Sequence, residues 1–215
     1  MKSLIFLLAL TLAFAQVVQP VFASQTVEME HFSIEFELLS EEELQQEPAP
    51  LVPAVESLPV SSFTFTVSKS QLIVPDVQGA ATEDTIVLSV DGSNEVGYQI
   101  SALEKTPFVS FAQDLIPPTS CNGGNDTCTA SMAKKWDNGK KFGFGYALKG
   151  DIIPADFIDE TYFRPFALNK NIVLANRQNP TGKDNITMKL RINTPASQPE
   201  GNYQTVIRLI AFPNL

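Results

Sequence analysis

Residues 185–194 read NITMKLRINT, and apolar and polar side chains alternate along this stretch without interruption. The apolar positions are Ile186, Met188, Leu190 and Ile192, and the polar positions are Thr187, Lys189 and Arg191. A period of two residues places each set on one face of a β-strand. The stretch therefore predicts a strand with one face in a core and the other face directed outward.

Similar segments recur along the second part of the chain. They are SSFTFTVS (61–68), EDTIVLSVDG (83–92), EVGYQISAL (95–103), KFGFGYALKG (141–150) and GNYQTVIRLIAFPNL (201–215). Turn-forming clusters DGSN, NPTG and PEGN separate them. This spacing predicts an all-β domain over residues 61–215, an antiparallel β-sandwich with Greek-key connections of the Ig-like or jelly-roll-like kind. The glycines that alternate in KFGFGYALKG indicate a bulge or a close approach of another backbone.

The first 60 residues have a different character. Residues 1–23 combine Lys2, an apolar run of about a dozen residues and small residues before Ser24, which is typical of a secretory signal peptide. Cleavage is expected after Ala23 or after Ala15, and an uncleaved membrane anchor is the alternative. Residues 24–60 are acidic and proline-rich, which predicts a disordered linker. We therefore expect a secreted, extracellular or cell-surface protein.

Charge and hydropathy limit the classes of partner. The net charge of −9 argues against nucleic acid, because a phosphate backbone attracts a basic face. After the signal, no segment is apolar for the roughly 20 residues that a membrane-spanning helix needs. The expected partners are a cell-envelope component or another surface protein, with a glycan as a further possibility.

Several segments resemble a known family. They are DTIVLSVDGSNEVGYQISA, WDNGKKFGFGYALKGD followed by YFRPFA, and INTPASQPEGNYQTVIRLIAFPNL. Together they resemble a family of secreted β-sandwich surface proteins from candidate-phyla-radiation (Patescibacteria) bacteria, over about residues 62–215. The final strand is more distantly similar to WxL-type cell-surface domains. Because no Trp-x-Leu motif occurs here, the likeness does not imply peptidoglycan binding. It implies a fold and an extracellular location, and no activity.

The loop CNGGNDTC contains both cysteines, Cys121 and Cys128. A redox pair normally has two intervening residues at a helix start, and a zinc site needs more thiolates or imidazoles than the single His31 supplies. In an exported chain a structural disulfide is the favoured interpretation. A weaker alternative is a calcium site that uses oxygens of the loop, from Asn122, Asn125, Asp126 and Thr127.

A basic cluster surrounds the single tryptophan, Trp136. Its members are Lys134, Lys135, Lys140 and Lys141. One interpretation is a site for a carbohydrate or an anionic polymer, in which Trp136 stacks on a sugar ring. The other is that Trp136 belongs to the core and the lysines are solvated, and the usual burial of tryptophan favours this one.

Catalytic groupings receive little support. A Ser-His-Asp triad has only His31 available, in the predicted linker. Asp156, Asp159 and Glu160 are close in sequence, as in glycoside hydrolases, but a solvated surface is the simpler interpretation. We therefore expect a non-enzymatic protein without a cofactor, with an exported hydrolase as the competing class.

Three functions remain open after these observations. The first is a secreted or cell-surface structural or interaction module. The second is the carbohydrate- or polymer-binding module just described. The third is fibre or pilin-like assembly, in which HFSIEFELL (31–39) adds a strand to a neighbouring molecule, because its apolar and acidic residues alternate.

Overall fold

The computed structural model describes residues 31–39, 63–75, 79–92, 97–178 and 182–214. The predicted signal peptide and most of the predicted linker lie outside these residues. The described strands are β1 His31–Leu39, β2 Phe63–Val67, β3 Gln71–Pro75, β4 Ala81–Gly92, β5 Tyr98–Ser110, β6 Lys134–Lys135, β7 Gly143–Lys149, β8 Tyr162–Phe163, β9 Ile172–Arg177, β10 Lys183–Asn193 and β11 Tyr203–Pro213. Within the described ranges, no helix is long and apolar enough to cross a membrane.

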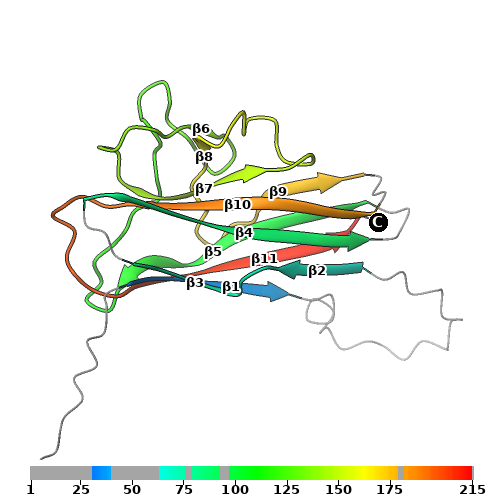
Figure 1. The fold of residues 1–215 in the computed structure, drawn as a ribbon, viewed down its shortest axis with the longest axis horizontal. Coiled ribbons are helices and arrows are strands. Elements are labelled where there is room, and N and C mark those ends of the chain that lie inside the picture. Colours follow the sequence, from blue (N-terminus) through cyan, green and yellow to red (C-terminus); the bar gives the residue numbers. More distant parts are fainter. Residues whose placement is uncertain (1–30, 40–62, 76–78, 93–96, 179–181, 215) are drawn as a thin grey trace, which may run out of the picture.

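Two sheets pack face to face, which confirms the predicted β-sandwich (Figure 1). The five-stranded sheet has the order β3-β1-β11-β5-β9, and the four-stranded sheet has the order β2-β4-β10-β7. Each pairing joins strands that are not consecutive in the chain, as in Greek-key sandwiches. The described strands pair antiparallel except β1 and β11, which run parallel.

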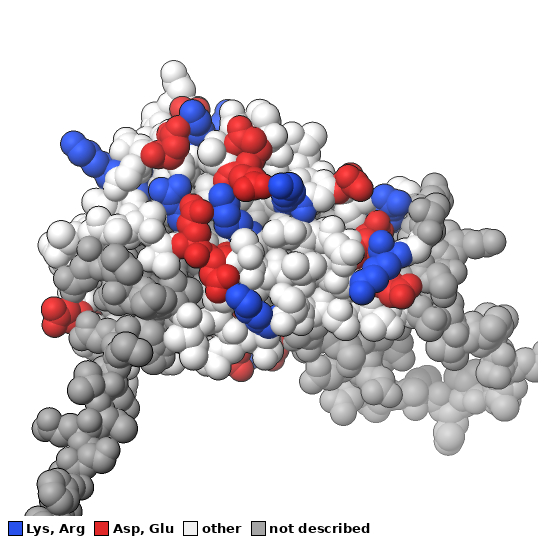
Figure 2. Space-filling model, in the orientation of Figure 1, with Lys and Arg blue, Asp and Glu red and all other residues white. Residues whose placement is uncertain are grey.

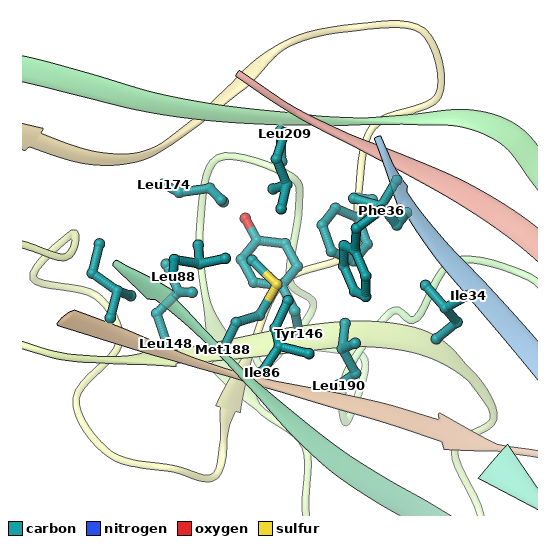
Figure 3. Packing of buried hydrophobic residues seen from close by; sticks show 14 of the residues in the cluster. Ile34, Phe36, Ile86, Leu88, Tyr146, Leu148, Leu174, Met188, Leu190 and Leu209 are labelled. Carbon is teal, nitrogen blue, oxygen red and sulfur yellow. The ribbon is translucent and has the colours of Figure 1, made fainter. Parts of the chain in front are cut away.

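The space between the sheets is filled by the apolar faces that the alternation predicts. On β10, the four residues Ile186, Met188, Leu190 and Ile192 are all buried. Aromatic rings fill much of the remaining volume, and the Tyr146 ring stacks on Phe166 with centroids 4.4 Å apart. Figure 3 shows Tyr146 and Met188 at the centre of this cluster.

Strand β1 corrects the predicted linker, because residues 31–39 belong to the sandwich. The strand lies between β3 and β11, antiparallel to the first and parallel to the second. Ile34 and Phe36 are buried in the core. The segment is acidic, but its acidic residues fall on the outward face: Glu37 bonds there to Lys105 and Arg208. Acidic residues on one face of the strand therefore do not prevent burial of its other face. The acidic composition of the segment gave no indication of this alternation between the two faces.

Glu104 on β5 is a carboxyl group on the inward side of the sheet, with an exposure of 7%. It lies at an irregularity in the β5–β11 pairing, opposite Ile207. The hydroxyl of Thr205 is 3.4 Å from its Oε1. Burial raises the pKa of Glu104 to about 7, although hydrogen bonds from Thr205 and the Phe108 backbone oppose the shift.

Glu104 is expected to make the folded state less stable as the pH rises. The unfolded chain releases this proton near pH 4.5 and the folded chain near pH 7, so between these values the folded state binds more protons. The contribution of Glu104 to stability is therefore greatest below pH 4.5 and falls by at most about 3 kcal/mol through pH 7, at about 1.4 kcal/mol per unit. Urea unfolding from about pH 4 to pH 8 measures it.

The variant Glu104→Gln removes the titrating group and keeps the shape, so its stability is expected to vary less over this interval. Glu200→Gln, at an exposed position, is the matched control and should keep the wild-type dependence. Equal pH dependence in wild type and Glu104→Gln would contradict the assignment.

Candidate functional site

The residues singled out in the sequence gather in a layer outside the four-stranded sheet. We call residues 117–142 and 150–166, on either side of β7, the loop platform. It contains the short pair β6–β8, which Figure 1 shows above β7 and β10. A second small hydrophobic cluster lies between the platform and β7, made of Cys121, Cys128, Trp136 and Phe163 from the platform and Ala147 from β7. The platform therefore has a core of its own on the outward face of the sheet.

The predicted disulfide is present between Cys121 and Cys128, whose Cα atoms are 5.5 Å apart. Both cysteines are buried. Gly123 in the ring has a φ of +75°, a left-handed conformation that glycine adopts without strain. The bond thus closes the loop at the point where the loop contacts the small core.

Asn122 is one of the suggested calcium ligands, and protein groups already use its side-chain oxygen. Asn122 Oδ1 accepts hydrogen bonds from the backbone N–H groups of Asp137 and Asn138, at 3.2 and 3.1 Å. Its Nδ2 donates to Asp137 Oδ1 at 2.8 Å. Asn125 and Asp126 are exposed. Across the described part of the chain, no group of three or more His, Cys, Asp or Glu side chains is arranged to hold a metal.

Trp136 is fully buried, so its ring is not available to stack on a sugar. The Arg191 guanidinium lies over the ring, 4.7 Å from its centroid, and Phe163 meets it edge-on at 5.3 Å. The indole N–H donates to the carbonyl of Lys141 at 3.0 Å. The prediction that Trp136 stacks on a sugar ring is therefore corrected, because this ring belongs to the small core.

Arg191 is one of the residues that join the platform to the sheet. It projects from the outward face of β10, and its Nη1 donates to the Trp136 carbonyl at 2.6 Å. Its neighbour Lys189 lies over the ring of Phe163, 5.1 Å from the centroid. Such contacts each contribute about 0.5–2 kcal/mol. The sequence pattern placed both residues on the polar face, but it held no sign that aromatic rings would cover them.

The lysines of the platform surface are interspersed with acidic groups. Lys135 pairs with Asp137 at 2.7 Å, and this hydrogen bond raises the pKa of Lys135 above its usual value. Lys140 and Lys141 are exposed, and Lys134 is half-buried. Figure 2 shows basic and acidic side chains intermingled over this part of the surface. The structure therefore does not separate the lysines from negative charge.

Each of the three carboxylates near residue 158 has its own partner. Asp156 binds Arg164 with two hydrogen bonds, Nε–Oδ2 at 3.1 Å and Nη2–Oδ1 at 2.5 Å. Burial raises the pKa of Asp156, but the bonds from Arg164 and the Ala133 N–H outweigh it and hold the pKa below its usual value. Asp159 accepts from Thr161, and Glu160 pairs with Lys149. These contacts hold the platform together.

Gly143 and Gly145 on β7 explain the glycine alternation in the sequence. A Cβ on Gly145 would lie 2.8 Å from the Arg164 carbonyl oxygen and 2.7 Å from the Thr119 methyl group. Gly143 has a φ of +140°, and a Cβ there would be 2.8 Å from the Thr119 Cα. The predicted close backbone approach is confirmed, because both platform segments lie directly against this strand.

No protein-family model matches the chain, and no curated protein matches it either.

The substitution Gly145→Ala is expected to loosen the platform. The added methyl group meets backbone that cannot move without breaking the pairing of Tyr146 with Arg164, so we expect a loss of about 2 kcal/mol in the free energy of unfolding. Gly139→Ala is the matched control, since a Cβ there has nothing within 4 Å. Chemical denaturation of both variants measures the difference. Equal stability of the two variants would contradict the packing described here.

Proposed function

We propose that the protein is an exported, non-catalytic structural or interaction module that acts outside the cell or at its surface. The observation that supports the proposal is that the candidate site residues of the platform make their hydrogen bonds within the protein. Trp136, Asn122 and Asp156 each bond to backbone or to other side chains of the protein. Groups arranged in this way give rigidity to a surface and leave their polar atoms engaged within the fold.

The disulfide and the N-terminal sequence support the extracellular location. A disulfide persists in oxidising compartments and is rare in the cytosol. Residues 1–23 carry the features of a secretory signal peptide. An acidic net charge favours solubility. The signal-like sequence and the disulfide favour export, and the acidic charge is compatible with it.

The geometry favours this proposal over the carbohydrate- or polymer-binding module. Aromatic stacking on a sugar needs an exposed ring face, and Arg191 covers one face of Trp136. Binding of a polyanion needs unopposed positive charge, and Asp137 lies 2.7 Å from Lys135. The cell-envelope or surface-protein partner proposed for the module would therefore contact a mixed-charge surface.

Export is tested by expressing the full-length chain in a bacterial host and fractionating the cells. The chain is expected outside the cytoplasm, shortened by residues 1–23 or 1–15, and lighter by two hydrogens because Cys121 and Cys128 are bonded. Measurement of the intact mass before and after reduction detects both the removal of the signal peptide and the disulfide. Deletion of residues 2–23 is the control and should keep the chain in the cytoplasm. An unprocessed, reduced chain in the cytoplasm of wild-type cells would contradict the proposal.

The same purified protein separates the module from the glycan-binding alternative. Soluble cell-wall glycans and anionic polymers are expected to leave Trp136 fluorescence unchanged, since the ring is buried. Quenching that saturates with added glycan would favour the binding module instead.

A further inference from the structure

We propose that β1 is an exchangeable strand, so that the position between β3 and β11 accepts β1 from a second copy of this chain. This inference rests on the proposed function, because it names the partner of the structural module. We call the position between β3 and β11, which β1 fills in the structure, the β1 slot.

The β1 slot is defined by two ladders of backbone pairing. Residues 32–39 pair in parallel with residues 203–210 of β11, and residues 31–35 pair antiparallel with residues 71–75 of β3. In the described residues, β3 joins the five-stranded sheet only through β1. Without β1, both ladders are therefore open, and unpaired strand edges bind further strands.

The inward side of the slot selects apolar residues two positions apart. Ile34 and Phe36 enter the main core from β1 and belong to the same cluster as Leu190 and Tyr146 (Figure 3). Their exposures are 0% and 4%, so an empty slot would open the core to water. Burying two such side chains contributes about 3–6 kcal/mol.

The outward side of the slot selects an acidic residue directly after Phe36. Glu37 Oε2 accepts from Arg208 Nε at 3.0 Å and lies 3.0 Å from Lys105 Nζ. The two cations come from β11 and β5, so neither belongs to the entering strand. The hydrogen bond from Arg208, followed by that from Lys105, holds the pKa of Glu37 below its usual value. A donor strand therefore needs the order apolar, any, apolar, acidic, which Ile34–Glu37 supplies.

A second copy of the chain offers the same strand with the same register. Between β1 and β2, the chain connection is residues 40–62, a length of 23 residues (62 − 39) that carries four prolines. At about 3.3 Å per residue it can extend to about 75 Å, long enough to reach another molecule. The disulfide links Cys121 to Cys128, so it does not tie β1 to the domain.

Contacts inside the slot are identical whether β1 comes from the same chain or from another. The balance between the two forms is then decided by the concentration of competing strands. A linked strand has an effective concentration on the order of millimolar, so exchange is expected when the chain concentration approaches that value. Molecules crowded at a surface, or refolding together, meet this condition. Reciprocal exchange closes a dimer, and one-way exchange extends a chain of copies.

A pair of cysteines across the slot reports which chain supplies β1. Glu35 on β1 lies opposite Gln71 on β3, and both positions are exposed. The double variant Glu35→Cys/Gln71→Cys is refolded from denaturant at about 1 mM and at about 1 µM chain, then cross-linked with a short bis-maleimide. At high concentration we expect covalent dimers and higher multiples on a denaturing gel, at least tenfold more than at low concentration. Intramolecular cross-links alone at both concentrations would overturn the proposal.

The matched control is Thr64→Cys/Asp91→Cys, at opposite exposed positions on β2 and β4. This pair does not involve β1, so it is expected to cross-link within one chain at both concentrations. Multimers that appear equally with this control would show random collision and would also overturn the proposal.

A charge reversal tests the exchange independently. Glu37→Arg places like charges in the chain's own slot, and Arg208→Glu does the same from the other side. When the two variants are mixed and refolded, reciprocal exchange pairs Arg with Glu in one slot and restores the native pair in the other. We expect the mixture to give several-fold more dimer than either variant alone. No enrichment of the mixed dimer over the separate variants would contradict exchange.

These results are distinguishable from a failure of the proposed function. A chain that is exported and oxidised but never exchanges β1 would leave the structural module intact and remove only the strand-exchange assembly. A chain retained in the cytoplasm would remove the proposed function, whatever the cross-linking shows.

Discussion

The packing of Arg191 on Trp136 connects the four-stranded sheet to the loop platform. β10 supplies inward residues of the sandwich core such as Met188 and Leu190, and the next residue after each of them, Lys189 and Arg191, lies on its outward face. The loop platform covers this outward face with Trp136 and Phe163. A single strand is therefore covered on both sides, by a large apolar core and by a small aromatic core with cations over its rings. That second contact and the backbone hydrogen bonds of Phe144 and Tyr146 hold the platform on the sheet.

Further contacts inside the platform hold its loops in place. Arg164 is buried, and a buried guanidinium is costly unless it is paired, which Asp156 does with two hydrogen bonds. Asn122 joins two segments of the loop through backbone N–H groups. A disulfide closes the same region. Each element restricts the loops relative to the sheet, which suits a surface that must keep its shape outside the cell.

Strand β1 completes the five-stranded sheet by lying between β3 and β11, although 23 residues separate it from the next strand in the chain. Its two faces follow separate rules: Ile34 and Phe36 enter the core, and Glu37 meets two cations on the outside. The same alternation that makes the strand fit its own domain makes it fit a copy of that domain. Assembly through β1 would use no surface beyond the one that folding already builds.

Local sequence patterns were sufficient to predict several of the long strands, the inward residues of β10 and the close backbone approach at Gly145, and the expected export predicted the cysteine pair. These features follow from the two-residue period, from the absence of a glycine side chain and from the oxidising compartment that an exported chain enters. The neighbours of each strand and the cover over its polar face were decided by tertiary structure. Trp136 became a core residue because Arg191 and Phe163 reach it from distant segments. Residues 31–39 became a strand because β3 and β11 accept them and because Lys105 and Arg208 neutralise Glu37. Such partners lie far apart in sequence, and a period of two residues carries no information about which of them will meet.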